Sequence, residues 1–220
     1  MKNCKFILLG VATLMAVACG QNASKQAADQ AADQTSTSQC YTISGSILKH
    51  PMANFVDSVY LSGDAGATAK SAVVEGKFSI SGEVAKPELV SIVFTYNGAM
   101  SGEFSLPVVL EAGEITFLGL PSKRFAGTPL NDSIVALNQR ANEVNAEVLN
   151  AAYYAKLADI LRTYIQNNPN DASTVYALRE GINSNLFAED EVWELLQVCG
   201  DEVNTTNFAK EICAKFDSAE

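Results

Sequence analysis

Apolar and polar residues alternate along the chain from Tyr41 to about Leu120. The clearest runs of period two lie at 41–47, 77–81 and 104–110. This alternation is typical of strands that bury one face. Six or seven such short strands, at roughly ten-residue spacing, predict a small antiparallel β-sandwich or half-open barrel.

Turn residues separate the runs. They are Gly63-Asp64-Ala65-Gly66, Glu75-Gly76, Asn97-Gly98 and Ala112-Gly113. The segments 73–78 and 110–115 have the pattern of β-hairpins. Several acidic side chains fall at strand ends and turns, where we expect them to be solvated: Asp57, Asp64, Glu75, Glu103, Glu111 and Glu114. No helical pattern interrupts the strands, which argues against a parallel α/β sheet.

The period changes to that of a helix at Gly127. Thr128 and Pro129 are a cap and a proline at the first helical position. An apolar stripe follows at spacings of three and four, through Leu130, Ile134, Leu137, Ala141, Val144 and Val148. Four more helices are expected, over about 153–166, from about 171, over 189–199 and around 208–216. The sequence therefore predicts an α+β protein, with an antiparallel β-domain at 40–126 and a segregated bundle of about five helices at 127–220.

The first 18 residues have the pattern of a signal peptide. Lys2 and Lys5 precede an apolar stretch at 6–15 that is shorter than the roughly 20 residues that span a bilayer. Small residues follow at 16–18, and Cys19 comes directly after them. This arrangement resembles a bacterial lipoprotein signal, in which the cysteine is acylated and becomes the new N-terminus.

Two interpretations of this cleavage site remain. Position 16 is Ala, where lipoprotein signals usually carry Leu, and Ala16-Val17-Ala18 is also an ordinary cleavage site that would release a soluble periplasmic protein. A cysteine followed by a small residue directly after the site favours lipidation of Cys19. The residues 19–39 are almost all small or polar, with Ala-Ala-Asp-Gln repeated at 27–30 and 31–34, and predict a flexible tether behind the anchor.

The charge of the chain narrows the class of partner. The formal net charge is −10, and removal of the first 18 residues, with their two lysines, leaves −12. An acidic body repels phosphate backbones, so we expect no nucleic-acid partner.

The order of turns and caps resembles a known family. The pieces that match are Tyr41-Thr42-Ile43-Ser44-Gly45, Val59-Tyr60-Leu61, Gly76-Lys77-Phe78, Glu111-Ala112-Gly113-Glu114-Ile115, Gly127-Thr128-Pro129-Leu130-Asn131-Asp132 and Asn168-Pro169. In Bacteroidota-type lipoproteins, a β-domain of unknown function and a helical spacer often precede a thioredoxin-like disulfide oxidoreductase domain. The resemblance covers about residues 41–215.

One departure from that family bears on activity. Its oxidoreductase members use a C-x-x-C pair of thiols, and this sequence has no C-x-x-C. The resemblance therefore implies the part of the family whose function is unknown, without the redox activity and without the thioredoxin-like domain.

The remaining candidates for chemistry are few. Cys199 and Cys213 lie on apolar helix faces and are expected in the core, whereas Cys40 ends the tether and is a candidate for a thiol contact with another molecule. His50 is the only histidine, and a lone loop histidine supports neither a zinc site nor a catalytic triad. Trp193 fits core packing better than a partner surface. We expect no cofactor, no metal and no catalytic site.

These patterns lead to one expected function and one alternative. The first is a non-enzymatic cell-envelope lipoprotein, anchored in the inner or outer membrane with its body in the periplasm or at the surface, that binds an envelope partner. The alternative is an accessory that docks onto a separate thioredoxin-like oxidoreductase.

Overall fold

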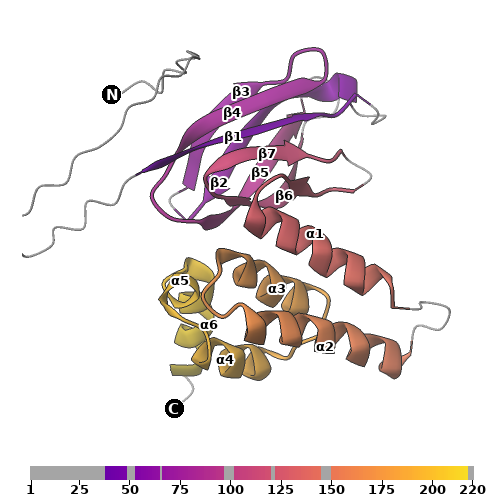
Figure 1. Cartoon of the computed structure of the whole chain (residues 1–220), viewed down its shortest axis with the longest axis vertical. Helices are drawn as coiled ribbons and strands as arrows, with labels where there is room; N and C mark the ends of the chain where they lie inside the picture. The colour runs from indigo at the N-terminus through magenta and orange to yellow at the C-terminus, as the bar shows by residue number, and fades with distance from the viewer. Residues whose placement is uncertain are drawn as a thin grey trace, which may run out of the picture. The chain divides into compact units, whose positions relative to one another are not determined.

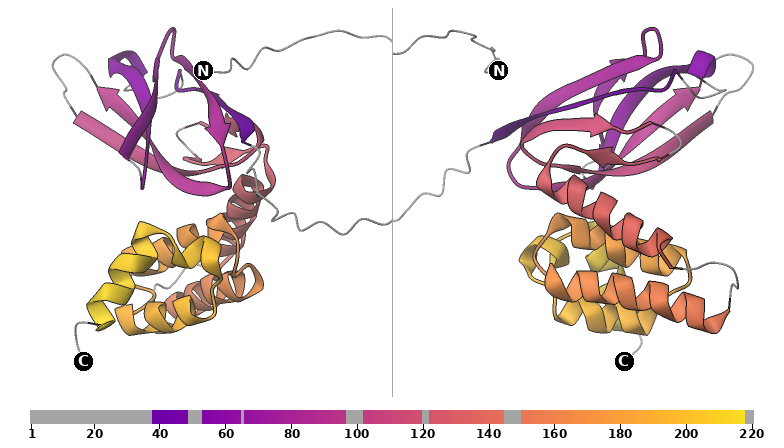
Figure 2. Two further views of the ribbon diagram at one scale, coloured as in Figure 1. Left: turned by 90° about the vertical axis from the view of Figure 1, so that its left-hand side faces the viewer. Right: turned by 45° about the vertical axis from the view of Figure 1, so that its right-hand side comes forward.

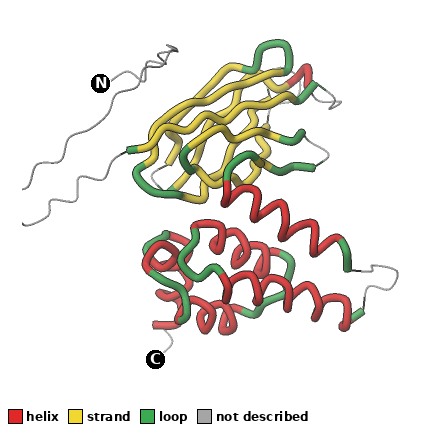
Figure 3. Tube along the Cα trace, in the orientation of Figure 1, coloured by secondary structure: helices red, strands yellow, loops and turns green. Residues whose placement is uncertain are grey.

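Eight strands come first in the fold and six helices follow, in the residues that the structure describes. The computed structural model describes residues 38–48, 53–64, 66–96, 102–119, 122–144 and 150–217. Figures 1 and 3 show the strands gathered in one half and the helices in the other. The chain is an α+β protein, as its periodicity predicts.

The strands form two four-stranded sheets. Sheet A has the order β4-β1-β7-β8 and sheet B the order β3-β2-β5-β6. The strands, with a short 3-10 helix at Ala53–Phe55 before β2, are β1 Gln39–Ser46, β2 Val56–Gly63, β3 Gly66–Ala72, β4 Lys77–Val84, β5 Glu88–Tyr96, β6 Gly102–Leu110, β7 Gly113–Phe117 and β8 Phe125–Ala126. The two sheets are seen from two more sides in Figure 2.

The two inner faces bury the apolar positions of the alternating pattern. Phe78 of sheet A meets Phe94 of sheet B edge to face, with ring centroids 5.6 Å apart. Phe117 of sheet A lies 5.7 Å from the same ring. Gly45 makes room for this cluster, because a Cβ at that position would lie 2.5 Å from Cβ of Phe117. The aromatic cluster therefore joins the two sheets.

The pairing of the strands differs from the antiparallel hairpins that the sequence predicts. β1 pairs with β4 antiparallel but with β7 parallel, from Tyr41↔Gly113 to Gly45↔Phe117. The expected hairpin at 110–115 is wrong, because β6 and β7 belong to different sheets. At 73–78, Val74 and Lys77 do form a tight bridge, but β3 and β4 also lead into different sheets. The alternation of apolar and polar residues shows which face of a strand is buried, but not which strand lies beside it. The connections β3–β4 and β6–β7 both keep the apolar face toward the core while the chain passes from one sheet to the other.

The helices are α1 Pro129–Asn142, α2 Ala151–Asn167, α3 Ala172–Asn183, α4 Glu189–Gln197, α5 Asp201–Asn204 and α6 Asn207–Asp217. The four-residue α5 is too short to leave a periodic signal, which explains why five were expected. The first helix ends at Asn142, before the last two positions of its apolar stripe. Val148, the last of them, lies outside the described residues.

Helix α3 is the centre of the helical half. Its residues 172–178 are all buried, among side chains from the other helices. Leu89 of β5 and Val109 of β6 belong to the same apolar cluster. The chain from Ser38 onward accordingly forms one compact unit, and sheet B contributes to the core of the helices.

The start of α1 is fastened to β6 by two buried polar side chains. Glu111 is 7% exposed, and its Oε1 accepts hydrogen bonds from the backbone N–H of Leu130 (2.8 Å) and of Asn131 (3.1 Å). The expectation that Glu111 is a solvated strand end is therefore wrong. The positive end of the helix and its unpaired amides stabilise this carboxylate away from water. Thr128 occupies the N-cap position, as predicted, but its side chain makes no cap hydrogen bond.

Asn131 completes this junction. Its amide donates to Val109 O (2.8 Å) and accepts from Val109 N (3.1 Å), so it pairs with the outer edge of β6 as another strand would. Every second residue of an edge strand points its backbone N–H and C=O away from the neighbouring strand. Pro107, two residues before Val109, occupies such a position and has no N–H to leave unpaired. The junction thus covers part of an open sheet edge.

Candidate functional site

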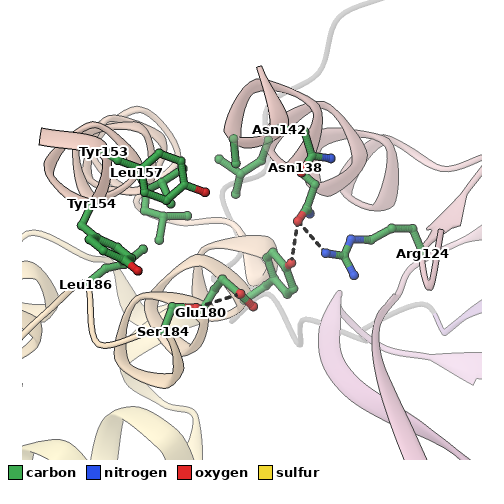
Figure 4. A pocket seen from close by; sticks show the side chains of 13 residues that line it. Arg124, Asn138, Asn142, Tyr153, Tyr154, Leu157, Glu180, Ser184 and Leu186 are labelled. Carbon is green, nitrogen blue, oxygen red and sulfur yellow. Dashed lines mark hydrogen bonds between the residues drawn. The ribbon is translucent and has the colours of Figure 1, made fainter. Parts of the chain in front are cut away.

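A cavity of about 430 Å³ opens among α1, α2 and α3 (Figure 4). Such a volume is typical of small-molecule sites. One wall is polar and carries Arg124, Asn138 and Tyr176, whereas the other carries tyrosine and leucine side chains from α2 and the segment after α3. The cavity is the strongest candidate site in the described part of the chain.

The polar wall is organised by Asn138 of α1. Its Nδ2 donates to Ile134 O (2.7 Å), which fixes the amide and directs Oδ1 into the cavity wall. Oδ1 accepts from Arg124 Nη2 (2.6 Å) and from the hydroxyl of Tyr176 (3.1 Å), as the dashed lines in Figure 4 show. Burial raises the pKa of Tyr176, so its hydroxyl stays protonated and remains a donor at neutral pH.

Arg124 comes from the segment that leads into β8. Its guanidinium carbon lies 5.9 Å from the centroid of the Tyr176 ring, and Nη1 donates to Lys123 O (3.1 Å). The Nε atom is buried and has no hydrogen-bond partner. No acidic side chain among the described residues forms an ion pair with this guanidinium. A positive charge is therefore held at the cavity wall without an opposite charge of its own.

Glu180 supplies a negative charge to the same cavity. It follows Tyr176 by one turn of α3 and accepts a hydrogen bond from Ser184 Oγ (3.2 Å). Within the described ranges, Glu180 also takes part in no ion pair. Arg124 and Glu180 therefore face one cavity, and their charged atoms are farther apart than the 4.0 Å of an ion pair.

The apolar wall consists of aromatic and leucine side chains. Tyr153 and Tyr154 of α2 lie edge to face, with ring centroids 5.2 Å apart, and Tyr154 is 46% exposed. Leu157, Leu161 and Leu186 continue this wall. An exposed aromatic ring beside a cavity gives a ligand apolar area to cover.

The helices around the cavity are held together by a chain of hydroxyl groups. Tyr164 OH of α2 lies 2.6 Å from Ser133 Oγ of α1 and donates to Ser173 Oγ of α3 (2.8 Å). Arg162 of α2 forms an ion pair with Glu191 of α4. These contacts fix the relative positions of the walls, so the cavity is preformed.

A second hollow, of about 570 Å³, lies in the sandwich. Tyr41, Lys86 and Glu88 are among the residues that line it. Burial, and then the charge of Glu88, raise the pKa of Tyr41. Lys86 is already paired with Glu202 of α5, at 3.0 Å. Because Glu202 already neutralises Lys86, this hollow is a weaker candidate for a ligand site than the helical cavity.

The described residues among those predicted to carry chemistry do not line either cavity. Cys40 is exposed on β1, whereas Cys199 is buried and its thiol donates to Leu195 O (3.3 Å). Burial raises the pKa of Cys199 to about 11, so this thiol is inert at neutral pH. Cys19 and His50 lie outside the described residues.

Two further sequence expectations concern the described helices. Cys213 is half-buried, and Trp193 packs against the apolar cluster of the helices, as expected of a core residue. In the described ranges, no three Cys, His, Asp or Glu side chains gather as metal ligands. None of the helices described is long and apolar enough to cross a bilayer.

No pattern in the sequence indicates the cavity. Arg124, Asn138 and Glu180 stand in three different segments, and no motif links them. The one local signal is the spacing of Tyr176 and Glu180, which puts them on the same face of α3. Nothing in that spacing points to Arg124.

Comparison with known families concerns the first half of the fold. Residues 41–134 match a domain of unknown function, DUF4369. The DUF4369 match runs from β1 into α1 and includes Glu111, Asn131 and Arg124. Asn138 and Glu180 follow it, so the cavity is shared between the DUF4369 region and the later helices. Comparisons with curated proteins and with solved structures gave no match.

Proposed function

We propose that this protein is a non-enzymatic lipoprotein of the cell envelope whose folded body binds a small ligand in the helical cavity. The observation that carries the proposal is Arg124, a cation without an acidic partner among the described residues, held against a preformed cavity with apolar walls. A guanidinium without an ion-pair partner at a cavity wall can bind the anionic group of a ligand. No nucleophile paired with a base lines the described walls, which favours binding over catalysis.

The placement in the envelope rests on the sequence. The segment 1–18 and Cys19 have the pattern of a lipoprotein signal, and the polar tether at 19–39 would hold the body away from the bilayer. The DUF4369 match agrees with a β-domain of unknown function after the tether. In this placement the cavity samples solutes of the periplasm or the cell surface.

A fluorescent probe tests binding in the cavity. The dye 8-anilinonaphthalene-1-sulfonate combines an anionic group for Arg124 with aromatic rings for the apolar wall. We expect saturable binding of one dye to the full-length lipoprotein in detergent. Ala141 lines the cavity, so Ala141→Phe should weaken binding at least tenfold, a loss of about 1.4 kcal/mol.

Ala136→Phe is the matched control for this test. Ala136 lies on the same helix but on its exposed side, so this substitution adds the same ring outside the cavity. It should bind the dye as the wild type does. Equal binding by both variants, or no saturable binding by the wild type, would show that the cavity is not a ligand site.

Docking onto a separate thioredoxin-like protein is the second candidate. The exposure of Cys40 on β1 favours it, because an exposed thiol can form a mixed disulfide with a partner. Envelope fractions of wild type and Cys40→Ser, quenched with acid and separated without reductant, provide the test. A disulfide-linked band that is lost in Cys40→Ser would support docking, whereas identical patterns would reject it.

A further inference from the structure

The two charges at the cavity differ in sign and stand on opposite parts of its polar side. Figure 4 shows Arg124 beside Asn138, and Glu180 beside Ser184. The guanidinium lies over the ring of Tyr176, and Glu180 begins one helical turn later, which corresponds to a rise of about 6 Å along α3. A ligand that satisfies both charges must therefore carry an anionic and a cationic group.

The guanidinium selects the anionic group. Its planar fork of N–H donors suits a carboxylate, which can accept two hydrogen bonds from it. Asn138 takes one Nη2 hydrogen bond and Lys123 O takes one from Nη1, so further donors remain. The carboxylate of Glu180 repels anions and attracts an ammonium group, and Ser184 keeps it hydrogen-bonded in place.

The volume of the cavity sets the length of the ligand. A single amino acid would fill only part of a cavity of about 430 Å³. Two residues in extended conformation span up to about 7 Å. The apolar wall of Tyr153, Tyr154 and Leu157 accommodates the side chains of such a ligand.

We infer that the cavity binds short apolar peptides with free ends, with the carboxylate on Arg124 and the ammonium on Glu180. This inference rests on the proposed function, because it names the ligand class of the same cavity. The length of bound peptide is two or three residues, since the cavity holds about 430 Å³. Longer chains are excluded when both ends must reach their partners.

Calorimetry with the full-length lipoprotein in detergent tests the ligand class. The probes are leucyl-phenylalanine with free ends, its N-acetyl form, its C-terminal amide and decanoate. The peptide with free ends should bind at least tenfold more tightly than either blocked form. Decanoate has the carboxylate and an apolar chain without the amine, so its binding should be weaker as well.

Two charge variants assign each end of the peptide. Arg124→Gln should remove the preference for the free carboxylate over the amide and keep the preference for the free amine. Glu180→Gln should do the reverse. Both side chains are partly exposed. Glutamine is isosteric with glutamate and is a shorter, neutral replacement for arginine, and thermal unfolding followed by circular dichroism checks that the variants fold.

The outcomes separate this inference from the proposed function. Blocked peptides or decanoate that bind within threefold of the free peptide would overturn the peptide class. Peptide binding that survives Ala141→Phe would also overturn it, because the binding would lie elsewhere. If the dye binds in the cavity and no peptide does, this inference falls and the proposed function stands. If neither binds, both fall.

Discussion

The carboxylate of Asp64 accepts a hydrogen bond from the backbone N–H of Asn207, at 2.7 Å, across 143 positions of sequence. Asp64 lies in the turn between β2 and β3, and Asn207 begins α6. The side-chain Nδ2 of Asn207 also donates to the backbone carbonyl oxygen of Asp64, at 3.4 Å. Lys86 and Glu202 form an ion pair between the loop after β4 and α5. The last helices are therefore fastened to the sandwich by its turns.

Removal of the Asp64 carboxylate should destabilise the protein. Asp64→Ala leaves the first turn of α6 without an acceptor, and the loss of a helix cap costs about 1 kcal/mol. Urea unfolding of the purified protein measures the change. Asp64→Asn keeps an acceptor oxygen and should lose less. A loss as large for Asn as for Ala would mean that charge, rather than the hydrogen bond, sustains the contact.

The Glu111 junction should be more sensitive, because it is buried. Glu111→Ala leaves two backbone amides of α1 without their acceptor and removes one of the acceptors of the Asn131 side chain, which we expect to cost about 2–3 kcal/mol. Asn131→Ala leaves the backbone N–H and C=O of Val109 without hydrogen-bond partners and should cost about 2 kcal/mol of unfolding free energy. Urea unfolding gives both values.

The double variant tests whether Glu111 and Asn131 act as one unit. Residues that share hydrogen bonds have coupled effects, so the loss in the double variant should fall short of the summed single losses by about 1 kcal/mol. Additive losses would show that the two side chains fasten α1 independently. Glu114, an exposed residue of β7, is the control: Glu114→Ala should change stability by less than about 0.5 kcal/mol.

Cys199 should make stability fall at alkaline pH. Burial raises the pKa of its thiol from 9.0 to about 11, so the folded protein keeps a proton that the unfolded chain loses. The stability from this difference is fully present below pH 9 and is lost as the pH rises through about 11. Between pH 8 and 10.5, the unfolding free energy of wild type should fall more than that of Cys199→Ala. Parallel curves would contradict this.

Cys19 is expected to decide where the protein is found. Cys19→Ala removes the thiol that would be acylated, so the protein should move from the membrane fraction to the soluble fraction and lose palmitate label. Cys40→Ser should stay in the membrane. Equal palmitate labelling of Cys19→Ala and wild type would refute the anchor.

Local patterns predicted much of the fold, but not its long-range pairings. The turn at Gly63–Gly66 and the helix start at Pro129 follow from the residues that occupy those positions. The pairing of β1 with β7 does not, because alternation gives the faces of a strand and not its neighbours. Glu111 looked like a solvated turn residue because its partners, the amides of α1, are backbone groups without a signature in the sequence.

The position of β1 has a mechanical consequence. It is the first strand described, yet it lies inside sheet A, between β4 and β7. A pull on the residues before Gln39, directed along the strand, would load the ladders on both sides simultaneously, since their hydrogen bonds run across that direction. A force applied along β1 would therefore have to break both ladders at once. A force that peels β4 from the edge of sheet A would break its hydrogen bonds one after another and would separate the sheet sooner.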